Sequence, residues 1–305
     1  METSRLNVVT GAFSYTGKYI AQRLLSLGER VKTLTGRSDL ENPFGNQVTI
    51  LPLGFDNLSQ LTGYLEGATT IYNTYWVRFP RGEVTFERAV ENNKTLIKAA
   101  EAAGIRRIVH ISVTNPSKKS PFAYFRGKAL IEEAILDSKL SYGILRPTVI
   151  FGTEGILINN IAWLLRKFPI YTVFGSGDYR IQPVFVEDVA EIAVSVGHRG
   201  DNLIMDVVGP EVYTFDELVK LIRGNVNSRA KIIHTRPELA FLLARLIGYA
   251  VKDVVITREE IRGLMSNLLV SASQPTAPTR FSEWLSKNAD GVGIRYISGL
   301  ERRYR

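Results

Sequence analysis

Residues 6–17 read LNVVTGAFSYTG, a short apolar run that leads into a glycine-containing loop. In a strand–turn–helix unit that binds a dinucleotide, a first glycine permits the tight turn, a second lets the backbone approach the pyrophosphate, and a third lets helix and strand pack closely. Gly11 and Gly17 fill the outer roles here, and Ser14 stands at the middle one. A serine keeps its backbone N–H and adds a hydroxyl, so this loop can still donate hydrogen bonds to phosphate.

The loop and the first residues of the following helix therefore form the predicted phosphate site. A glycine turn without a ligand would leave the same pattern and is the alternative. The residues assigned to the predicted site are Gly11, Phe13, Ser14, Tyr15, Thr16 and Gly17.

Beyond this loop, short β-branched runs alternate with helical patterns. The helical patterns cover about residues 16–27, 58–65, 86–103 and 121–137, with Ser120 as the expected N-cap of the last one and Gly104 ending the third. This alternation predicts parallel strands with crossover helices, and six strand-like runs in this order predict an α/β fold with a doubly wound parallel sheet. The runs are residues 6–11, 30–37, 47–55, 69–76, 106–113 and 141–147.

After Pro147 the alternation becomes irregular and the later segments are mostly helical. We predict a dinucleotide-binding domain over residues 1–150. Residues 151–305 form the predicted substrate-binding region, with elements that return to the sheet and helices near the C-terminus. The apolar stretch LAFLLARLIGYAV, residues 239–251, is interrupted by Arg245 and is shorter than a membrane span. We interpret it as an amphipathic or buried helix, and we favour a core helix over two alternatives, a dimer face and a membrane-surface patch.

The composition narrows the function classes. The 305 residues include no cysteine and three isolated histidines, which argues against disulfides, thiolate chemistry and a structural metal site. The net charge of +8 comes from basic residues dispersed along the chain, and no nucleic-acid-binding motif accompanies it. The N-terminus has no signal-peptide pattern, so we expect a cytoplasmic protein that acts on a small molecule. A homodimer and association with a membrane surface or a larger complex stay open.

The end of the second strand indicates which dinucleotide binds. A carboxylate there would bind the ribose hydroxyls of NAD, whereas an arginine accommodates the 2′-phosphate of NADP. Arg37 stands at this point and favours NADP, with Asp39 as an alternative ribose ligand and NAD left open. Asp56, after the third strand, is placed beside the adenine or at the N-cap of the next helix. Asn73 and Tyr75 end the fourth strand at the same edge, near the expected ribose and nicotinamide.

Tyr124 and Lys128 are four residues apart and therefore share one helix face. A tyrosine hydroxyl is a weak acid at neutral pH, but a cation one turn away stabilises its phenolate. The pair follows the fifth strand at the crevice end of the sheet, where an acid for hydride-transfer chemistry has to stand. A coincidental pair on a helix is the alternative. Ser112 or Thr114, just past that strand, are candidate hydrogen-bond donors to a substrate oxygen.

Together these segments resemble the short-chain dehydrogenase/reductase superfamily, which has a Rossmann fold, and its extended and atypical branches. The resemblance rests on TGAFSYTG, Asp56, YNTYW, HIS, YFRGK and LRPTVIFG, which follow the family's order over the first half of the chain, and on VFVEDVA at 184–190. The most similar branch is that of the NADPH-binding accessory subunit of respiratory complex I and of nitrogen-metabolite-repression-type regulators.

The resemblance implies roles for individual residues. Tyr124 becomes the acid–base, Lys128 the partner that lowers its pKa and binds the ribose, and Ser112 the donor to substrate. Pro147 joins the cofactor-binding residues, and 184–190 becomes a segment that returns to the sheet and lines the substrate pocket. Two features depart from the family's pattern: Ser14 replaces the middle glycine, and the interval between Ser112 and Tyr124 is shorter than in sugar-modifying members.

The sequence therefore predicts an NADP-preferring oxidoreductase that acts on a carbonyl or a secondary alcohol. Two other functions remain compatible with it. One is a non-catalytic NADP-binding sensor or accessory subunit, and the other is an NAD(P)-dependent nucleotide-sugar epimerase or dehydratase.

Overall fold

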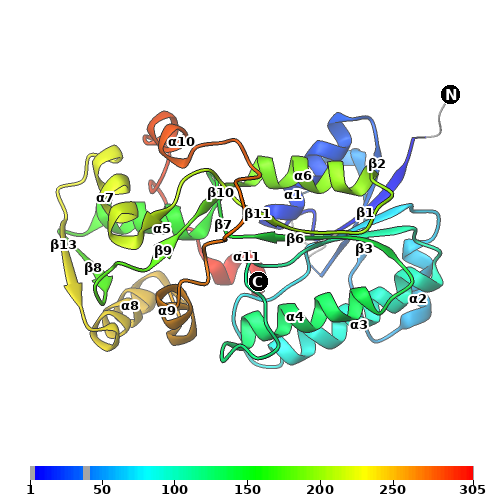
Figure 1. Cartoon of the computed structure of the whole chain (residues 1–305), viewed down its shortest axis with the longest axis horizontal. Coiled ribbons are helices and arrows are strands. Elements are labelled where there is room, and N and C mark those ends of the chain that lie inside the picture. Colours follow the sequence, from blue (N-terminus) through cyan, green and yellow to red (C-terminus); the bar gives the residue numbers. More distant parts are fainter. Residues whose placement is uncertain (1–3, 37–41, 305) are drawn as a thin grey trace. The chain divides into compact units, whose positions relative to one another are not determined.

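The computed structural model describes residues 4–36 and 42–304 (Figure 1). Arg37 and Asp39 lie outside the described residues. The chain forms two compact units: the first contains Met1–Pro147 and Glu187–Asp206, and the second contains Thr148–Val186 and Val207–Arg305. The chain therefore leaves the first unit after Pro147 and returns to it for one helix and most of one strand.

The first unit is built on a seven-stranded sheet with the strand order β11-β6-β5-β4-β1-β2-β3. The first six strands along the chain pair in parallel, which confirms the predicted doubly wound α/β fold. The seventh strand, β11, joins the sheet beside β6 and was not predicted. The strands are β1 Leu6–Thr10, β2 Arg30–Thr35, β3 Val48–Pro52, β4 Thr70–Asn73, β5 Arg107–Ile111, β6 Ser141–Pro147 and β11 Leu203–Val207.

Helices cover both faces of this sheet. In Figure 1, α1 and α6 lie over one face, and α2, α3 and α4 lie over the other. The core beneath α2, α3 and α4 is aliphatic, and Ile71, Ile108 and Ile144 from three neighbouring strands are fully buried in it. The helices of this unit are α1 Tyr15–Ser26, α2 Leu58–Leu65, α3 Phe86–Ala102, α4 Ala123–Leu136 and α6 Val186–His198, and a short 3-10 helix, η1, covers Gly45–Gln47.

Helix α4 begins later than its sequence predicts. Its N-cap residue is Phe122, whereas the hydroxyl of Ser120 accepts a hydrogen bond from the Phe122 N–H at 3.2 Å. Ser120 therefore stabilises a turn before the helix, because a serine hydroxyl can serve a local turn as well as a cap. Tyr124 consequently lies in the first turn of α4, as its second residue.

The ends of two other helices were also predicted, one correctly and one wrongly. Gly104 has a φ of +72° just after α3, as expected for a glycine that ends a helix. The N-cap of α2 is Asn57, whose side chain accepts from the Gln60 N–H at 3.0 Å. The alternative that placed Asp56 at this cap was wrong, and Asp56 is exposed.

The second unit is mostly helical, with three two-stranded sheets that pair β10 with β7, β12 with β9, and β13 with β8. Its core is rich in aromatic rings, and Phe151 contacts both Phe281 and Trp284. The strands are β7 Val149–Phe151, β8 Ile170–Phe174, β9 Arg180–Ile181, β10 Pro183–Phe185, β12 Tyr213–Thr214 and β13 Lys231–Thr235. The helices are α5 Ile156–Lys167, α7 Phe215–Asn225, α8 Pro237–Val251, α9 Arg258–Met265, α10 Phe281–Asn288 and α11 Gly299–Tyr304.

The segment 184–190 differs from its expected place. Its first two residues belong to β10, which pairs with β7 outside the seven-stranded sheet, and the remainder begins α6. The strand that returns to the large sheet is β11, further along the chain. The expectation that some element after residue 150 returns to the sheet was therefore correct, but the segment chosen for it was wrong.

Helix α8 was predicted to be a buried core helix, and this was wrong. Only Ala240 and Gly248 of its residues are buried. Leucine side chains that would fill a core are instead exposed. Among the described residues, no helix combines the length and the apolar character that crossing a membrane requires.

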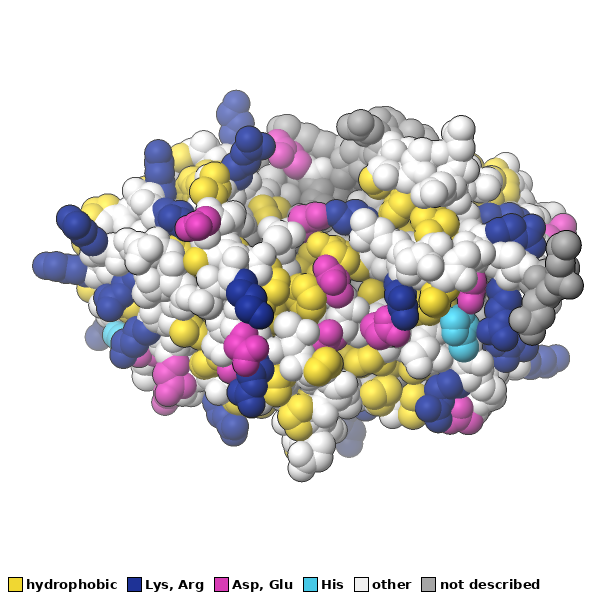
Figure 2. All heavy atoms as spheres, turned by 90° about the horizontal axis from the view of Figure 1, so that it is seen from above, with side chains coloured by type: hydrophobic (Ala, Val, Ile, Leu, Met, Phe, Trp, Pro, Cys, Tyr) yellow, Lys and Arg dark blue, Asp and Glu magenta, His cyan; other side chains and the backbone are white. Residues whose placement is uncertain are grey.

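The charges of the molecule are interspersed. On the face shown in Figure 2, Lys and Arg side chains alternate with acidic and apolar ones instead of forming one continuous patch. This agrees with the dispersed basic residues of the sequence.

Candidate functional site

The strand order of the large sheet reverses direction between β1 and β4. β1 and β4 are neighbours in the sheet. β2 lies on the other side of β1, and β5 lies on the other side of β4. In open parallel sheets, ligands bind beyond the carboxyl ends of the strands at such a point. Here, the Thr10 hydroxyl accepts from the Thr74 N–H at 2.8 Å, and the Thr74 hydroxyl donates to the Thr10 carbonyl at 2.5 Å.

The glycine loop leaves β1 at this same point. Gly11 has a φ of +71°, which favours glycine, and its N–H donates to the Leu34 carbonyl at 2.8 Å. A Cβ at Gly17 would lie 2.2 Å from the Gly11 carbonyl oxygen. Gly17 therefore allows α1 to pack directly on the turn, which is the role that the motif assigns to its last glycine.

Ser14, in place of the middle glycine, is the N-cap residue of α1. Its φ is −85° and its ψ is 168°, an extended conformation open to any residue, and its side chain makes no capping hydrogen bond. The first turn of α1 contains no acidic residue. An uncompensated helix N-terminus carries partial positive charge and N–H groups, so the loop fits the pyrophosphate of a dinucleotide.

Asn73 lies at the end of β4 but is fully buried. Its amide nitrogen donates to Asn93 at 2.7 Å and lies 3.1 Å from the Nδ1 atom of His110. Its amide oxygen accepts from the Tyr75 N–H at 3.1 Å. The Asn73 side chain therefore connects β4, β5 and α3 in the interior of the first unit.

Tyr75 is partly buried beside this network. Its hydroxyl accepts from the Asn92 amide at 2.8 Å, and its ring packs on Phe55 with centroids 5.0 Å apart. Burial raises the pKa of the Tyr75 hydroxyl. Phe55 and Tyr75 thus form an aromatic pair from the segments that follow β3 and β4, next to the exposed Asp56.

Tyr124 and Lys128 meet at the indole ring of Trp76. The Tyr124 ring lies edge-on to Trp76 with centroids 5.7 Å apart, and Lys128 Nζ lies 5.0 Å from the centroid of the same ring. Lys128 is buried, and its Nζ donates to the Ile111 carbonyl at 2.7 Å. A Cβ at Gly127 would lie 2.6 Å from the Trp76 ring, so a glycine here lets the indole contact α4. The structure therefore brings the predicted pair together at the end of β5.

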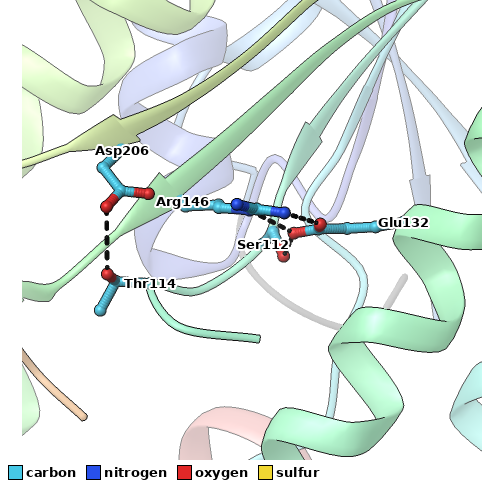
Figure 3. Close-up of polar contacts among 5 residues, drawn as sticks. All are labelled: Ser112, Thr114, Glu132, Arg146 and Asp206. Atoms are coloured by element: carbon cyan, nitrogen blue, oxygen red, sulfur yellow. Dashed lines mark hydrogen bonds and ion pairs between the residues drawn. The ribbon is translucent and has the colours of Figure 1, made fainter. Parts of the chain in front are cut away.

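Ser112, directly after β5, is buried and bonded to an acid. Its hydroxyl donates to Glu132 Oε1 at 2.5 Å, and Glu132 also receives two hydrogen bonds from the guanidinium of Arg146, at 3.0 Å and 2.5 Å (Figure 3). A serine hydroxyl has a single proton to donate. In this arrangement, Ser112 offers only lone pairs to any further group.

Figure 3 shows Arg146 between the carboxylates of Glu132 and Asp206. The hydrogen bonds to Glu132, followed by the charges of both carboxylates, raise the pKa of Arg146. Asp206 also accepts from the Thr114 hydroxyl at 3.4 Å, and the Thr114 N–H donates to the carbonyl of the buried Pro147 at 3.0 Å. These contacts join the ends of β5, β6 and β11.

The pattern of the NAD dependent epimerase/dehydratase family matches residues 7–207. The chain belongs to this family. The match covers the glycine loop, the Tyr124–Lys128 pair and the Ser112–Glu132 contact, and the family's cofactor class agrees with the nicotinamide dinucleotide predicted from the loop. The predicted resemblance to extended short-chain dehydrogenases is thereby confirmed.

Two curated relatives of the chain are named as subunits of mitochondrial NADH dehydrogenases. The chain is 25% identical over 284 residues to the protein of Arabidopsis thaliana named "NADH dehydrogenase [ubiquinone] 1 alpha subcomplex subunit 9, mitochondrial", which covers 86% of this chain and 70% of the relative. It is 23% identical over 263 residues to the "NADH-ubiquinone oxidoreductase 40 kDa subunit, mitochondrial" of Neurospora crassa, which covers 83% and 68%.

A solved structure shares the fold of the family. The triphenylmethane reductase of Citrobacter sp., crystallised with NADP(H), superposes with a TM-score of 0.77 at 16% identity over 94% of this chain and 100% of the reductase. This likeness supports the Rossmann fold of the chain and carries no statement about its substrate.

Several residues of this site were not predicted from the sequence, among them Asp206. Glu132 and Arg146 form the ion pair that holds Ser112, and Thr74 joins β4 to the end of β1. The position of Glu132, four residues after Lys128 on α4, is a helical spacing that could have indicated a shared face. Nothing in the sequence pairs Arg146 with it.

Proposed function

We propose that the first unit binds NADP(H) at its glycine loop and that the protein is an oxidoreductase acting on a carbonyl or a secondary alcohol. The observation that carries this proposal is the contact of Tyr124 and Lys128 with one indole ring at the end of β5. When bound, the nicotinamide supplies or accepts the hydride. Gly11, Ser14 and Gly17 would hold the pyrophosphate at the α1 N-terminus.

Two residues of α4 would carry out the proton transfer to and from the substrate oxygen. Tyr124 would give a proton to the carbonyl oxygen in reduction and remove it from the alcohol in oxidation. Lys128, fixed by the Ile111 carbonyl, would stabilise the phenolate by its charge and reach the ribose. Ser112 would accept a hydrogen bond from a substrate hydroxyl, because its own proton is directed at Glu132.

The test is Tyr124→Phe, assayed with NADPH and a panel of carbonyl compounds. We expect turnover to fall at least about a hundredfold, the lower range for loss of a general acid, while the affinity for NADPH stays within about twofold. Tyr64→Phe on α2 is the matched control, since Tyr64 is also partly buried, and it should keep full activity. Retained turnover in Tyr124→Phe would refute the role.

The preference for NADP rests on Arg37, which lies outside the described residues. A guanidinium can bind the 2′-phosphate through two parallel hydrogen bonds. Calorimetric titration of the cofactor-stripped protein should show tighter binding of NADPH than of NADH, and Arg37→Ala should remove most of that difference. An equal loss for both dinucleotides would exclude the phosphate contact.

A non-catalytic role for the bound dinucleotide is the second candidate, and the Ser112–Glu132 contact favours it. In that arrangement no proton of Ser112 is left to polarise a carbonyl. The relatives that are named as subunits of NADH dehydrogenases favour assembly with a larger partner. If the protein has this function, NADPH should stay bound through gel filtration, and no carbonyl compound should be turned over.

We also keep a cytoplasmic location as the proposed compartment. The curated relatives described above are named as mitochondrial. Fractionation of cells that express the full-length protein would test the location.

A further inference from the structure

Helix α8 of the second unit presents an apolar face to solvent. Its inner side packs Ala240 and Phe241 against Phe174 and Ile261. The outer side carries leucines and a tyrosine that are half or more exposed: Leu239 50%, Leu242 51%, Leu246 57% and Tyr249 73%. The spacings of three, four and three place these four side chains on one stripe of the helix.

Basic side chains lie beside this stripe and at both of its ends. Arg245 lies within α8, Arg236 and Lys252 flank its two ends, and all three are exposed. Arg258, at the start of α9, lies with its guanidinium 4.9 Å from the ring of Phe241. Glu238 is the single acidic residue within α8. An apolar stripe with a cationic border is thereby formed on one side of the helix.

A hollow of about 690 Å³ adjoins the stripe. It is lined mainly by apolar side chains, and Arg245 and Tyr249 border both the hollow and the stripe. Val254, Ile256 and Leu300 contribute to its apolar lining. The exposed apolar surface is therefore wider than the helix alone.

We propose that α8 and its basic border dock on a phospholipid bilayer that contains anionic lipids. A helix with an apolar face lies in the plane of the interface, with that face among the upper acyl chains and basic side chains at the phosphates. Tyrosine is enriched at this depth, as expected for Tyr249 at the end of the stripe. The docking is independent of the dinucleotide and of catalysis.

The charges favour a bilayer over a second copy of the chain. In a two-fold dimer through α8, the same patch lies on both sides of the interface, so the cations of both copies are brought together, and Glu238 is the single acidic residue that each helix offers them. Phosphate groups neutralise those cations and leave the leucines in contact with acyl chains. A bilayer therefore satisfies both features of the surface.

The experiment is flotation of the full chain with vesicles of phosphatidylcholine that contain about one third phosphatidylglycerol, compared with vesicles of phosphatidylcholine alone. We expect cofloating protein with the anionic vesicles and little with the neutral ones. The triple variant Leu239→Gln, Leu242→Gln, Leu246→Gln should lower the partition coefficient at least about tenfold. The double variant Arg245→Gln, Lys252→Gln should lower it about tenfold and reduce its dependence on salt.

The control is Leu27→Gln with Leu58→Gln, which removes two leucines that are each 45% exposed in the first unit and should leave flotation unchanged. Thermal unfolding midpoints identify any variant that fails to fold. Three results would overturn the proposal. They are no binding to anionic vesicles, equal binding to both kinds of vesicle, or a dimer in sedimentation that the triple variant abolishes.

Discussion

The Ser112 hydroxyl donates to Glu132 across 2.5 Å, and both side chains are buried. A buried carboxylate is stable only when its lone pairs are satisfied, and Arg146 supplies two further donors to the same group. The three side chains link the end of β5 to α4 and β6. Ser112, which was expected to contact substrate, is thus also held by the internal structure of the first unit.

Glu132→Gln tests this structural role. The amide cannot accept from Ser112 and from both guanidinium nitrogens, so at least one donor loses its partner. We expect the free energy of unfolding to fall by about 2–3 kcal/mol, somewhat less than for breaking a fully buried pair. Arg146 is 29% exposed, and water compensates part of the loss. Urea denaturation at neutral pH measures the difference.

The neighbouring Glu133 provides the control. It forms an ion pair with Lys118 at 2.5 Å, but the two side chains are 45% and 56% exposed. Glu133→Gln should therefore change the free energy of unfolding by less than about 1 kcal/mol. Similar losses in the two variants would mean that burial does not distinguish the two pairs.

Gly17→Ala tests the close approach of α1 to the glycine loop. The added methyl would meet the Gly11 carbonyl oxygen at 2.2 Å, a backbone atom that cannot move without displacing the turn. We expect a loss of about 1–3 kcal/mol in stability and a clear loss of NADPH affinity. Thermal unfolding and calorimetry measure the two effects.

A glycine in α2 serves as the reference for this substitution. A Cβ at Gly63 has no heavy atom within 4 Å. Gly63→Ala should stabilise the protein by roughly 0.5–1 kcal/mol, since alanine is the better helix former. A stabilising Gly17→Ala would contradict the packing described at the loop.

Local signals explain what was predictable from the sequence. The strand–loop–helix at the start of the chain, the end of α3 at Gly104 and the span of β6 all depend on neighbours within a few residues. Glycine at a positive φ and alternating apolar runs record such local constraints. A regular alternation of parallel strands and crossover helices allows few sheet topologies, so the order of the elements was enough to predict the doubly wound fold.

The missed features depend on distant contacts. Ser112 and Glu132 are 20 residues apart, and the choice of partner for a hydroxyl is not encoded near it. Helix α8 is apolar on both sides, so its pattern does not tell which side is buried, and the sequence favoured a core helix. The start of α4 is a local exception, and it was misplaced because Ser120 can stabilise a turn as well as a cap.

Gly127→Ala tests the contact between α4 and Trp76. The new methyl would lie 2.6 Å from the end of the indole, so the ring has to move away from Tyr124 and Lys128. We expect a loss of about 1–3 kcal/mol and a change in tryptophan fluorescence. In the double variant with Trp76→Phe, the smaller ring relieves the clash, so the combined loss should be less than the sum. Additive losses would show that the two positions do not interact.

His110 makes the stability of the first unit depend on pH. Burial, and then the charge of Lys128, hold the pKa of its imidazole well below the ordinary value, and Nδ1 lies 3.1 Å from the Asn73 amide nitrogen, which donates to it. The unfolded chain binds a proton at this residue below about pH 6.5, whereas the folded chain does not. Because the unfolded state then binds more protons, the free energy of unfolding decreases as the pH falls. The contribution of neutral His110 to stability is therefore fully present above that pH and is lost below it.

His110→Gln removes this titration and keeps an acceptor of similar reach. Urea denaturation at pH 7.5 and 5.5 gives the pH dependence of both proteins. Between these values, the wild type should lose about 1.4 kcal/mol more than the variant, the linkage for one histidine one pH unit below its unfolded pKa. The variant is expected to be less stable at both pH values, but the comparison uses only the change with pH. Equal losses in the two proteins would mean that the folded His110 takes up its proton as readily as the unfolded chain does.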